Sequence, residues 1–398
     1  MGPLAGVKVV EMGVWVAGPS CAAILADWGA EVTKIEPPEG DPFRGLFAGL
    51  LDLPMNPPFE LDNRGKRSIS LNLEREEARA VAQRLIDDAD VFVSNMRPRV
   101  LEKYGFSYEA CAARNPRLIY AQLTGYGPDS EEANRASYDI GAFWSRAGVV
   151  ASLMPEGHEP PQQRGGMGDH MTGASTAGAI SAALYSREKT GKGQRLAVSL
   201  LRVGIYMMGW DTNTQLRMGL TGALPYDRQH AVNPIINSFR DRDGKWFWLL
   251  LLQADRHWPD LLRALDAAHL HEDPRFRDIP TRRDNAAALV QELDAIITKR
   301  SLAEWAPIFD RENVWFAPVN TIAEVVADPL TASAGAWVDV DSPDGLHRQV
   351  ATPADFYGTP VEVGGWAPEL GQNTEEILLE LGYDWDKIIA LKDTGAIP

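Results

Sequence analysis

The order of apolar and polar positions over the first 205 residues predicts strands that alternate with helices. Short apolar runs rich in β-branched residues are typical of strands, and they lie at 7–12, 31–35, 90–95, 118–123 and 195–200. Segments with helical spacing or with many small residues lie between them, at 20–28, 73–88, 107–115 and 170–188. Because strands that alternate with helices form βαβ units, we expect a parallel sheet with helices on its faces.

The pattern changes beyond about residue 205. A buried strand is expected at 246–252, because this run is apolar throughout. Helices are expected near 255–267, 284–299, 302–311 and 320–327, paired strands within 338–350, and a final helix at 373–381. A chain of 398 residues with such a change of pattern predicts two domains.

Composition narrows the class of protein. Hydrophobic residues make up 45% of the chain and charged residues 24%, as in a globular protein with a large core. Cys21 and Cys111 lie far apart and form no Cys/His cluster, which argues against a disulfide framework or a bound metal. The N-terminus lacks the basic region of a signal peptide, and 246–252 is far shorter than the roughly 20 residues of a membrane span. We therefore expect a cytoplasmic protein.

The charge balance points away from polyanionic partners. The formal net charge of -16 disfavours nucleic acid or an anionic membrane as a partner. Against this acidic background, basic residues gather beside predicted strands, at 63–67, at Arg97 and Arg99, and at Lys103. Ligands of open α/β sheets bind at strand ends, so these residues indicate a ligand with phosphate groups. Ordinary solvated surface charge is the alternative for each of them.

The turn after the first strand superficially resembles a dinucleotide site. Gly13 and Gly18 precede a helix, and Glu36 ends the second strand. The dinucleotide fingerprint needs G-x-G-x-x-G, whereas here the spacing is G-x-x-x-x-G with the bulky Trp15 between the glycines. The spacing therefore favours a plain βαβ turn over a nicotinamide or flavin site.

A second candidate is the glycine-rich segment 165–170, which ends in Asp169 and His170. Asp169 directly before a predicted helix has the position of an N-cap. Alternatively, the glycines leave room for a substrate, and the helix N-terminus keeps the carboxylate ionised and offers N–H groups to an oxyanion, a setting that suits a nucleophile. His170 is either a general base or a structural residue. Both alternatives stay open on these residues alone.

Several motifs, taken in their order and spacing, are shared with one known family. They lie at 14–19, 34–38, 65–71, 95–98, 138–139, 168–169, 189–194, 317–320 and 370–375. On these motifs the sequence resembles the class III CoA-transferases, the CaiB/BaiF family, over nearly the whole chain.

The resemblance implies an α/β fold with a Rossmann-like large domain, a smaller α+β domain, and two subunits interlocked as a homodimer. On this basis we expect residues 1–205 to form the CoA-binding and catalytic part of the large domain. Residues 206–325 would form the small domain, and residues 326–398 would return to the large domain.

The resemblance also implies a catalytic residue and a binding site. Asp169 matches the family's catalytic aspartate. Residues that match the CoA site are Val16, Ala17, Arg67, Leu71, Asn95, Met96, Arg97 and Lys103, and Tyr138 and Asp139 match a pair near the thioester. Coenzyme A and acyl-CoA then enter as substrates together with carboxylic acids, and no tightly bound cofactor is expected.

The implied chemistry transfers coenzyme A from an acyl-CoA to a carboxylic acid, through a mixed anhydride and an aspartyl-CoA thioester on Asp169. Formyl-CoA transferases carry Gln where Val16 stands and a basic residue where Pro37 and Pro38 stand. These departures argue against formate and oxalate as substrates.

Two alternative functions are open. A 2-methylacyl-CoA racemase of the same superfamily needs a base on each face of the α-carbon. That branch has His where Tyr138 stands, and Tyr, with an ordinary pKa of about 10, is a poor base. A non-catalytic CoA-binding protein is the other alternative, and a thioester trapped on Asp169 would exclude it.

Overall fold

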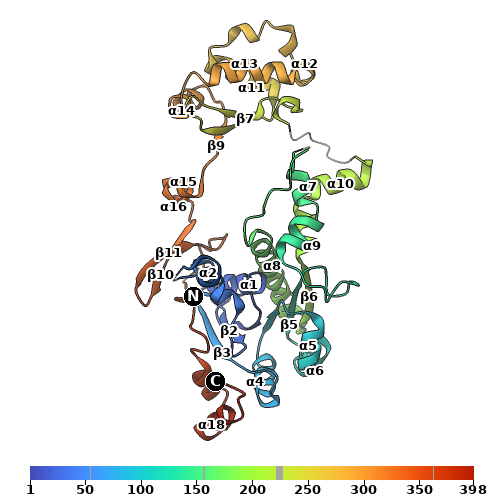
Figure 1. Ribbon diagram of the computed structural model, residues 1–398, viewed down its shortest axis with the longest axis vertical. Coiled ribbons are helices and arrows are strands. Elements are labelled where there is room, and N and C mark those ends of the chain that lie inside the picture. The colour runs from blue at the N-terminus through green and yellow to red at the C-terminus, as the bar shows by residue number, and fades with distance from the viewer. Residues whose placement is uncertain (54, 156, 221–226, 362) are drawn as a thin grey trace. The chain divides into compact units, whose positions relative to one another are not determined.

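The computed structural model describes residues 1–53, 55–155, 157–220, 227–361 and 363–398 (Figure 1). The described chain forms two compact units. Unit 1 comprises Met1–Ala151, Pro161–Gly209 and Leu330–Pro398, and unit 2 comprises Ser152–Pro160 and Trp210–Pro329. The domain boundaries expected from the sequence stay a prediction, because this grouping does not show which segments fold by themselves.

Helices and strands alternate along the first half of the chain. The strands are β1 (Lys8–Met12), β2 (Glu31–Glu36), β3 (Lys66–Ser70), β4 (Val91–Ser94), β5 (Ile119–Thr124), β6 (Gln194–Ser199), β7 (Ile236–Arg240), β8 (Trp246–Leu250), β9 (Phe316–Pro318), β10 (Trp337–Ser342) and β11 (Gly345–Val350). The helices up to residue 218 are α1 (Ala17–Asp27), α2 (Leu46–Leu51), α3 (Pro57–Asn63), α4 (Glu76–Asp87), α5 (Pro98–Tyr104), α6 (Tyr108–Arg114), α7 (Val149–Leu153), α8 (Met167–Thr190), α9 (Leu200–Met207) and α10 (Gly209–Met218). The later helices are α11 (Ala254–Leu265), α12 (Ile279–Asp284), α13 (Ala286–Ile297), α14 (Leu302–Arg311), α15 (Ile322–Ala327), α16 (Pro329–Ser333), α17 (Thr374–Glu380) and α18 (Trp385–Asp393).

Unit 1 is built on a six-stranded sheet in the order β3-β2-β1-β4-β5-β6. All five neighbouring pairs are parallel, which confirms the predicted α/β fold with a parallel sheet. From β1 the sheet grows first outwards through β2 and β3 and then on the other side through β4, β5 and β6. Such a switch point between β1 and β4 leaves a crevice at the carboxyl ends of these two strands. A ligand site is therefore expected at the loops after Met12 and after Ser94.

Two apolar layers cover the two faces of this sheet, because successive strand residues point to opposite sides. Val91 and Val93 of β4 pack with α1 and α8, whereas Phe92 packs on the other face with α4, α6, α17 and α18. The small residues of α8 let it approach α1 closely. A Cβ on Gly173 would lie 2.2 Å from the Ser20 Oγ, so only glycine fits there.

Unit 2 has a three-stranded antiparallel sheet in the order β7-β8-β9. Its core is formed by one face of that sheet and by α11, α13 and α14. The prediction of a fully buried strand at 246–252 is wrong. Phe247 and Leu249 are buried, but Trp246, Trp248 and Leu250 are exposed, because helices cover only one face of this antiparallel sheet.

The hairpin of β10 and β11 confirms the paired strands predicted within 338–350. Helix α18 was missed by the sequence analysis, although Asp384 caps it by accepting a hydrogen bond from the Lys387 amide. Among the helices that the structure describes, none combines the length and the hydropathy of a membrane span.

Candidate active site at the sheet switch point

A cavity of about 330 Å³ lies at the crevice that the strand order predicts. Its walls come from the loop after β1, the loop after β4, the segment that follows β5, and the start of α8. The lining residues are Val14, Trp15, Ala17, Asn95, Met96, Arg97, Val100, Leu123, Thr124, Gly125, Ala133, Arg135, Ala136, Ser137, Tyr138, Asp169, Thr172 and Leu200. Six of the residues expected at the site therefore share one cavity: Ala17, Asn95, Met96, Arg97, Tyr138 and Asp169.

The loop after β1 is held by polar side chains on three sides. The Val14 amide donates to the Asn95 Oδ1 at 3.0 Å, and the Trp15 amide donates to the Asp41 Oδ1 at 3.0 Å. The buried Lys34 Nζ donates to the Gly13 carbonyl at 3.0 Å. Trp15 adopts a left-handed backbone with φ 65°, which is uncommon for a bulky residue and needs such support.

Trp15 places its ring against Tyr138 in an edge-to-face contact, with ring centroids 5.6 Å apart. Tyr138 itself is largely exposed, and both residues line the cavity. The two rings supply an apolar wall close to the segment that carries Asp169. Such a wall suits an apolar group of a ligand.

Asp169 occupies the first turn of α8 and is not the N-cap of that helix. The helix begins three residues earlier than its sequence suggested, with Gly166 as N-cap at φ 77°. Among the described residues, none donates a hydrogen bond to the Asp169 carboxylate. The N-cap interpretation of Asp169 is therefore wrong, and the carboxylate faces the cavity with its lone pairs free.

The three glycines before Asp169 are present for different physical reasons. Gly166 supplies the positive φ that starts α8. Gly168 is a packing position, because a Cβ there would lie 2.5 Å from the Phe143 ring. Nothing in the described structure crowds Gly165. The expectation that all three glycines clear space for a substrate is wrong for Gly166 and Gly168.

The surroundings of Asp169 favour its protonated form. Burial, together with the negative charges of Asp139 and Asp62, raises the pKa of Asp169 to about 7, although His170 lowers it. The expectation that the helix N-terminus keeps this carboxylate ionised is therefore wrong. Burial and like charges outweigh the partial charge of the helix.

Asp139 uses the amides at the start of α8. Its Oδ2 accepts a hydrogen bond from the Gly168 amide at 3.2 Å and one from the Gln163 Nε2 at 3.0 Å, and the Asp169 amide also bonds to this carboxylate. Burial nevertheless raises the pKa of Asp139. The sequence predicted that amides at this helix start would bind an oxyanion. Two of them, those of Gly168 and Asp169, instead donate to Asp139.

His170 forms a pair with Asp62 of α3, a residue that the sequence analysis did not single out. The His170 Nε2 lies 2.9 Å from the Asp62 Oδ1. Burial lowers the pKa of His170, but the hydrogen bond and charge of Asp62, with the charges of Asp169 and Asp139, raise it overall. Burial raises the pKa of Asp62 despite His170 and Lys66. The site thus combines three carboxyl groups and one imidazole.

The remaining expected residues lie away from the cavity wall. The side chains of Val16 and Leu71 are buried in apolar clusters. Arg67 forms an ion pair with Glu380 at 2.6 Å, and Lys103 forms one with Glu74 at 2.5 Å. These four side chains are therefore engaged within unit 1.

The structure adds residues to the site that had no clear signal in the sequence. Arg135, Ser137 and Thr124 line the cavity, and Arg135 forms an ion pair with Glu132 at its exposed end. No motif in the sequence marked Thr124, Arg135 or Ser137 as part of the site. Asp62 lies 108 residues before His170, so only the fold could pair them.

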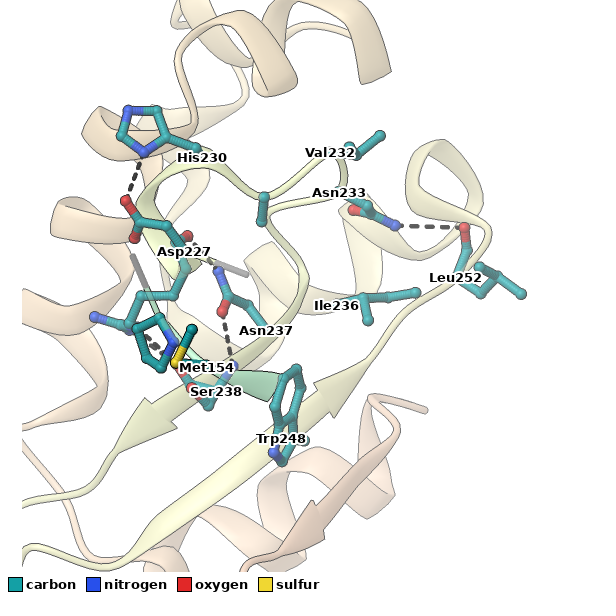
Figure 2. Close-up of a pocket in the computed structure, with 13 residues that line it drawn as sticks. Met154, Asp227, His230, Val232, Asn233, Ile236, Asn237, Ser238, Trp248 and Leu252 are labelled. Carbon is teal, nitrogen blue, oxygen red and sulfur yellow. Dashed lines mark hydrogen bonds and ion pairs between the residues drawn. The ribbon is translucent and has the colours of Figure 1, made fainter. Parts of the chain in front are cut away.

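A second cavity, of about 1090 Å³, lies within unit 2 (Figure 2). Its charged and amide side chains are already paired. Asp227 bonds to His230 at 2.6 Å, and Asn237 donates to the Arg228 carbonyl at 2.7 Å. Its other walls are largely apolar, with Trp248 standing on β8 (Figure 2). The cavity around Asp169 is therefore the better candidate for a reactive centre.

Comparisons with known proteins show what the chain is similar to. The family model described as CoA-transferase family III matches residues 4–374. The (R)-2-hydroxy-4-methylpentanoate CoA-transferase of Clostridioides difficile is 33% identical over 99% of both chains. The cinnamoyl-CoA:phenyllactate CoA-transferase of Clostridium sporogenes is 30% identical over 97% of this chain and 95% of the relative. A crystal structure of a CaiB/BaiF family protein from Brucella suis superposes with a TM-score of 0.83 at 30% identity, covering 96% of this chain and 99% of that one.

Proposed function

This chain belongs to CoA-transferase family III, and we propose that it transfers coenzyme A by way of a covalent intermediate on the Asp169 carboxylate. The alternatives of a racemase and of a non-catalytic binding protein are set aside, because the family model and the two named relatives are CoA-transferases.

The observation that carries the proposal is the environment of Asp169. Its carboxylate faces the cavity without a hydrogen-bond donor, and its pKa is raised to about 7. A carboxylate is an ordinarily weak nucleophile, and hydrogen bonds would weaken it further by occupying its lone pairs. A carboxylate that is more basic and free of donors is correspondingly more reactive towards a thioester carbonyl.

The proposed reaction balances without an outside reagent. The Asp169 carboxylate attacks the thioester carbonyl, the C–S bond breaks, and a mixed anhydride and the CoA thiolate form. The thiolate attacks the aspartyl carbonyl, which releases the first acid as a carboxylate and leaves an aspartyl-CoA thioester. The incoming carboxylate then repeats these two steps in reverse order. Net charge is conserved, because one carboxylate enters and one leaves.

Arg97 is the strongest candidate for a contact with the phosphates of coenzyme A. It lines the cavity at the end of β4, is exposed, and forms no ion pair among the described residues. Arg67 and Lys103 already pair with carboxylates, so we assign them a smaller part in binding. The energy of binding the remote nucleotide part of coenzyme A would hold the thioester at Asp169.

The acyl groups are proposed from the cavity wall and from the relatives. Trp15 and Tyr138 present an apolar wall. The names of the two relatives carry a branched alkyl or an aromatic group on the acid. We therefore propose acids with a branched or aromatic apolar side chain as substrates.

Trapping the intermediate tests the proposal. The protein is mixed with cinnamoyl-CoA, 4-methylpentanoyl-CoA or acetyl-CoA and treated with hydroxylamine, and the peptide that contains Asp169 is analysed by mass spectrometry. A hydroxamate on Asp169 in the wild type, and its absence in Asp169→Asn, supports the mechanism. Transfer of CoA between acids without modification of Asp169 contradicts it.

The assembly and location implied by the resemblance stay predictions. An interlocked homodimer predicts twice the chain mass of 43.8 kDa in light scattering behind size exclusion, and a cytoplasmic protein predicts recovery in the cytosolic fraction.

A further inference from the structure

The pair formed by His170 and Asp62 differs from surface His–Asp pairs because its carboxylate is buried and only partly hydrogen-bonded. The Asp62 side chain is buried, and its Oδ2 has no hydrogen-bond partner among the described residues. The His170 Nε2, 2.9 Å from the Oδ1, is thus the only donor that the described structure gives to this carboxylate. A buried carboxylate with one donor depends strongly on the charge of that donor.

The position of both partners is fixed. The His170 ring packs against Gly166, where a Cβ would lie 3.2 Å from its Cε1 and Nδ1. On the other side, the Lys66 Nζ donates to the Asp62 carbonyl at 2.7 Å and to the Asn63 Oδ1 at 3.1 Å. The end of α3 is therefore tied to β3, and the partly exposed His170 ring is held by its bond to Asp62 and by Gly166 on one side.

We propose that His170, held by Asp62, is a positioning residue that places a positive charge beside Asp169 and so stabilises the ionised form of the Asp169 carboxylate, which is the form that attacks. Its Nε2–H donates to Asp62, and a second proton on Nδ1 makes the ring an imidazolium. Moving a proton from Asp169 to His170 breaks an O–H bond and forms an N–H bond, so the total charge of the site is unchanged.

The groups that face this pair support a charged imidazole. Asp139, before the π-helix Ile140–Arg146, and Asp169 both raise the pKa of His170, in addition to Asp62. Behind Asp62 lie Lys66 of β3 and Lys34 of β2, which lower the pKa of Asp62. His170 therefore interacts with the charges of three carboxyl groups, while the two lysines pair with Glu11.

The inference rests on the proposed role of Asp169, but its test needs no substrate. A water-soluble carbodiimide with glycine ethyl ester couples to a carboxyl group in proportion to its protonated fraction. Labelling of Asp169 is measured by peptide mass spectrometry across a pH series for the wild type, His170→Gln and His170→Lys. His347→Gln is the matched control, because His347 pairs with the exposed Asp344 at 3.0 Å on the hairpin of β10 and β11.

We expect His170→Gln to move the midpoint of Asp169 labelling to higher pH by about one unit, since an opposite charge has been removed. His170→Lys, which keeps a positive charge, and the control should leave the midpoint at or below that of the wild type. Equal upward shifts in the glutamine and lysine variants, or no shift in the glutamine variant, overturn the inference.

The lysine variant keeps the test decisive if the glutamine variant does not fold, as judged by circular dichroism. A midpoint above that of the wild type in a folded His170→Lys then overturns the inference, and a midpoint at or below it supports the inference. The result of the hydroxylamine experiment does not depend on the labelling result. A failure of the proposed function is therefore distinguished from a failure of this inference.

Discussion

Val14 and Asn95 exchange two hydrogen bonds across the switch point of the sheet. The Val14 amide donates to the Asn95 Oδ1 at 3.0 Å, and the Asn95 Nδ2 donates to the Val14 carbonyl at 2.6 Å. The Asn95 side chain thus satisfies both the amide and the carbonyl of Val14, as the backbone of a neighbouring strand would. Gly13 and Gly18 make room for it, because a Cβ on either would lie within 3.2 Å of the Asn95 side chain.

We expect Asn95→Ala to release this loop and to weaken binding of acyl-CoA. Two partly buried backbone groups lose their partners, at a cost of about 1–3 kcal/mol in the free energy of unfolding. The KM for acyl-CoA should rise more than kcat falls, because Trp15 lies in the same loop. Thermal unfolding and steady-state kinetics measure both effects, with Asn320→Ala, an exposed site in unit 2, as control. An unchanged KM contradicts this positioning role.

The fully buried carboxylate of Glu11 holds two lysines beneath the site. Its oxygens accept from the Lys34 Nζ at 2.8 Å and from the Lys66 Nζ at 2.6 Å. Glu11→Gln would leave the buried Lys66 ammonium without a carboxylate partner, while Lys34 would keep Asp41 at 3.0 Å. Leaving a buried charge unpaired costs about 3–5 kcal/mol in the free energy of unfolding. Denaturant unfolding should show this loss, while Glu31→Gln at an exposed position of the neighbouring strand should have little effect. Equal stability of the two variants would contradict the structural role of the buried pairs.

The sequence predicted the parallel sheet most clearly at β4 and β5, which are buried along their whole length. It failed for β8, where Trp246 and Trp248 are apolar but exposed. An apolar run shows that a strand is present, but it does not show which face the fold covers. The helix of residues 385–393 was missed for a similar reason, since charged residues mask its few buried positions, Ile388 and Leu391.

The sequence singled out Asp169, which lines the cavity, but it did not predict the environment of that residue. The segment around Asp169 indicated a helix start, whereas the start lies at Met167 and the amides there bond to Asp139. The pKa of Asp169 is set by burial and by Asp139 and Asp62, which approach from distant parts of the chain. Such long-range electrostatics cannot be derived from local spacing.

Arg97 and Lys103 should differ in their importance for coenzyme A. Arg97→Gln removes a cation that faces the cavity without an ion pair among the described residues, and we expect the KM for acyl-CoA to rise by roughly tenfold with little change in kcat. Lys103→Gln breaks an exposed pair with Glu74 and should raise KM by less. Steady-state kinetics at two salt concentrations measure both variants. Equal effects of the two variants would contradict the assignment of Arg97.

Asp169→Asn should abolish transfer and at the same time stabilise the fold. The pKa of Asp169 is raised to about 7, so the folded state binds the proton more tightly than the unfolded state. Stability contributed by this group is therefore lost as pH rises from about 4 to about 7, and the neutral amide avoids that loss at pH 8. We expect the variant to unfold at a higher temperature at pH 8, with a gain of at least about 1 kcal/mol. An active Asp169→Asn protein would contradict the mechanism, and a lower unfolding temperature would contradict the electrostatic assignment.

The rate of transfer should rise with pH through about 7, because only the ionised Asp169 carboxylate attacks the thioester and its pKa lies there. Below that value kcat/KM should fall about tenfold for each pH unit, as the reactive fraction falls. A carboxylate with the ordinary pKa of about 4 would instead give a flat profile from about pH 5.5 upwards. The initial rate of CoA transfer, measured from about pH 5 to about pH 9 with the best donor and acceptor of the panel, distinguishes the two. A flat profile would show that Asp169 is already ionised in the free enzyme, and it would contradict the balance of burial and like charge found at this site.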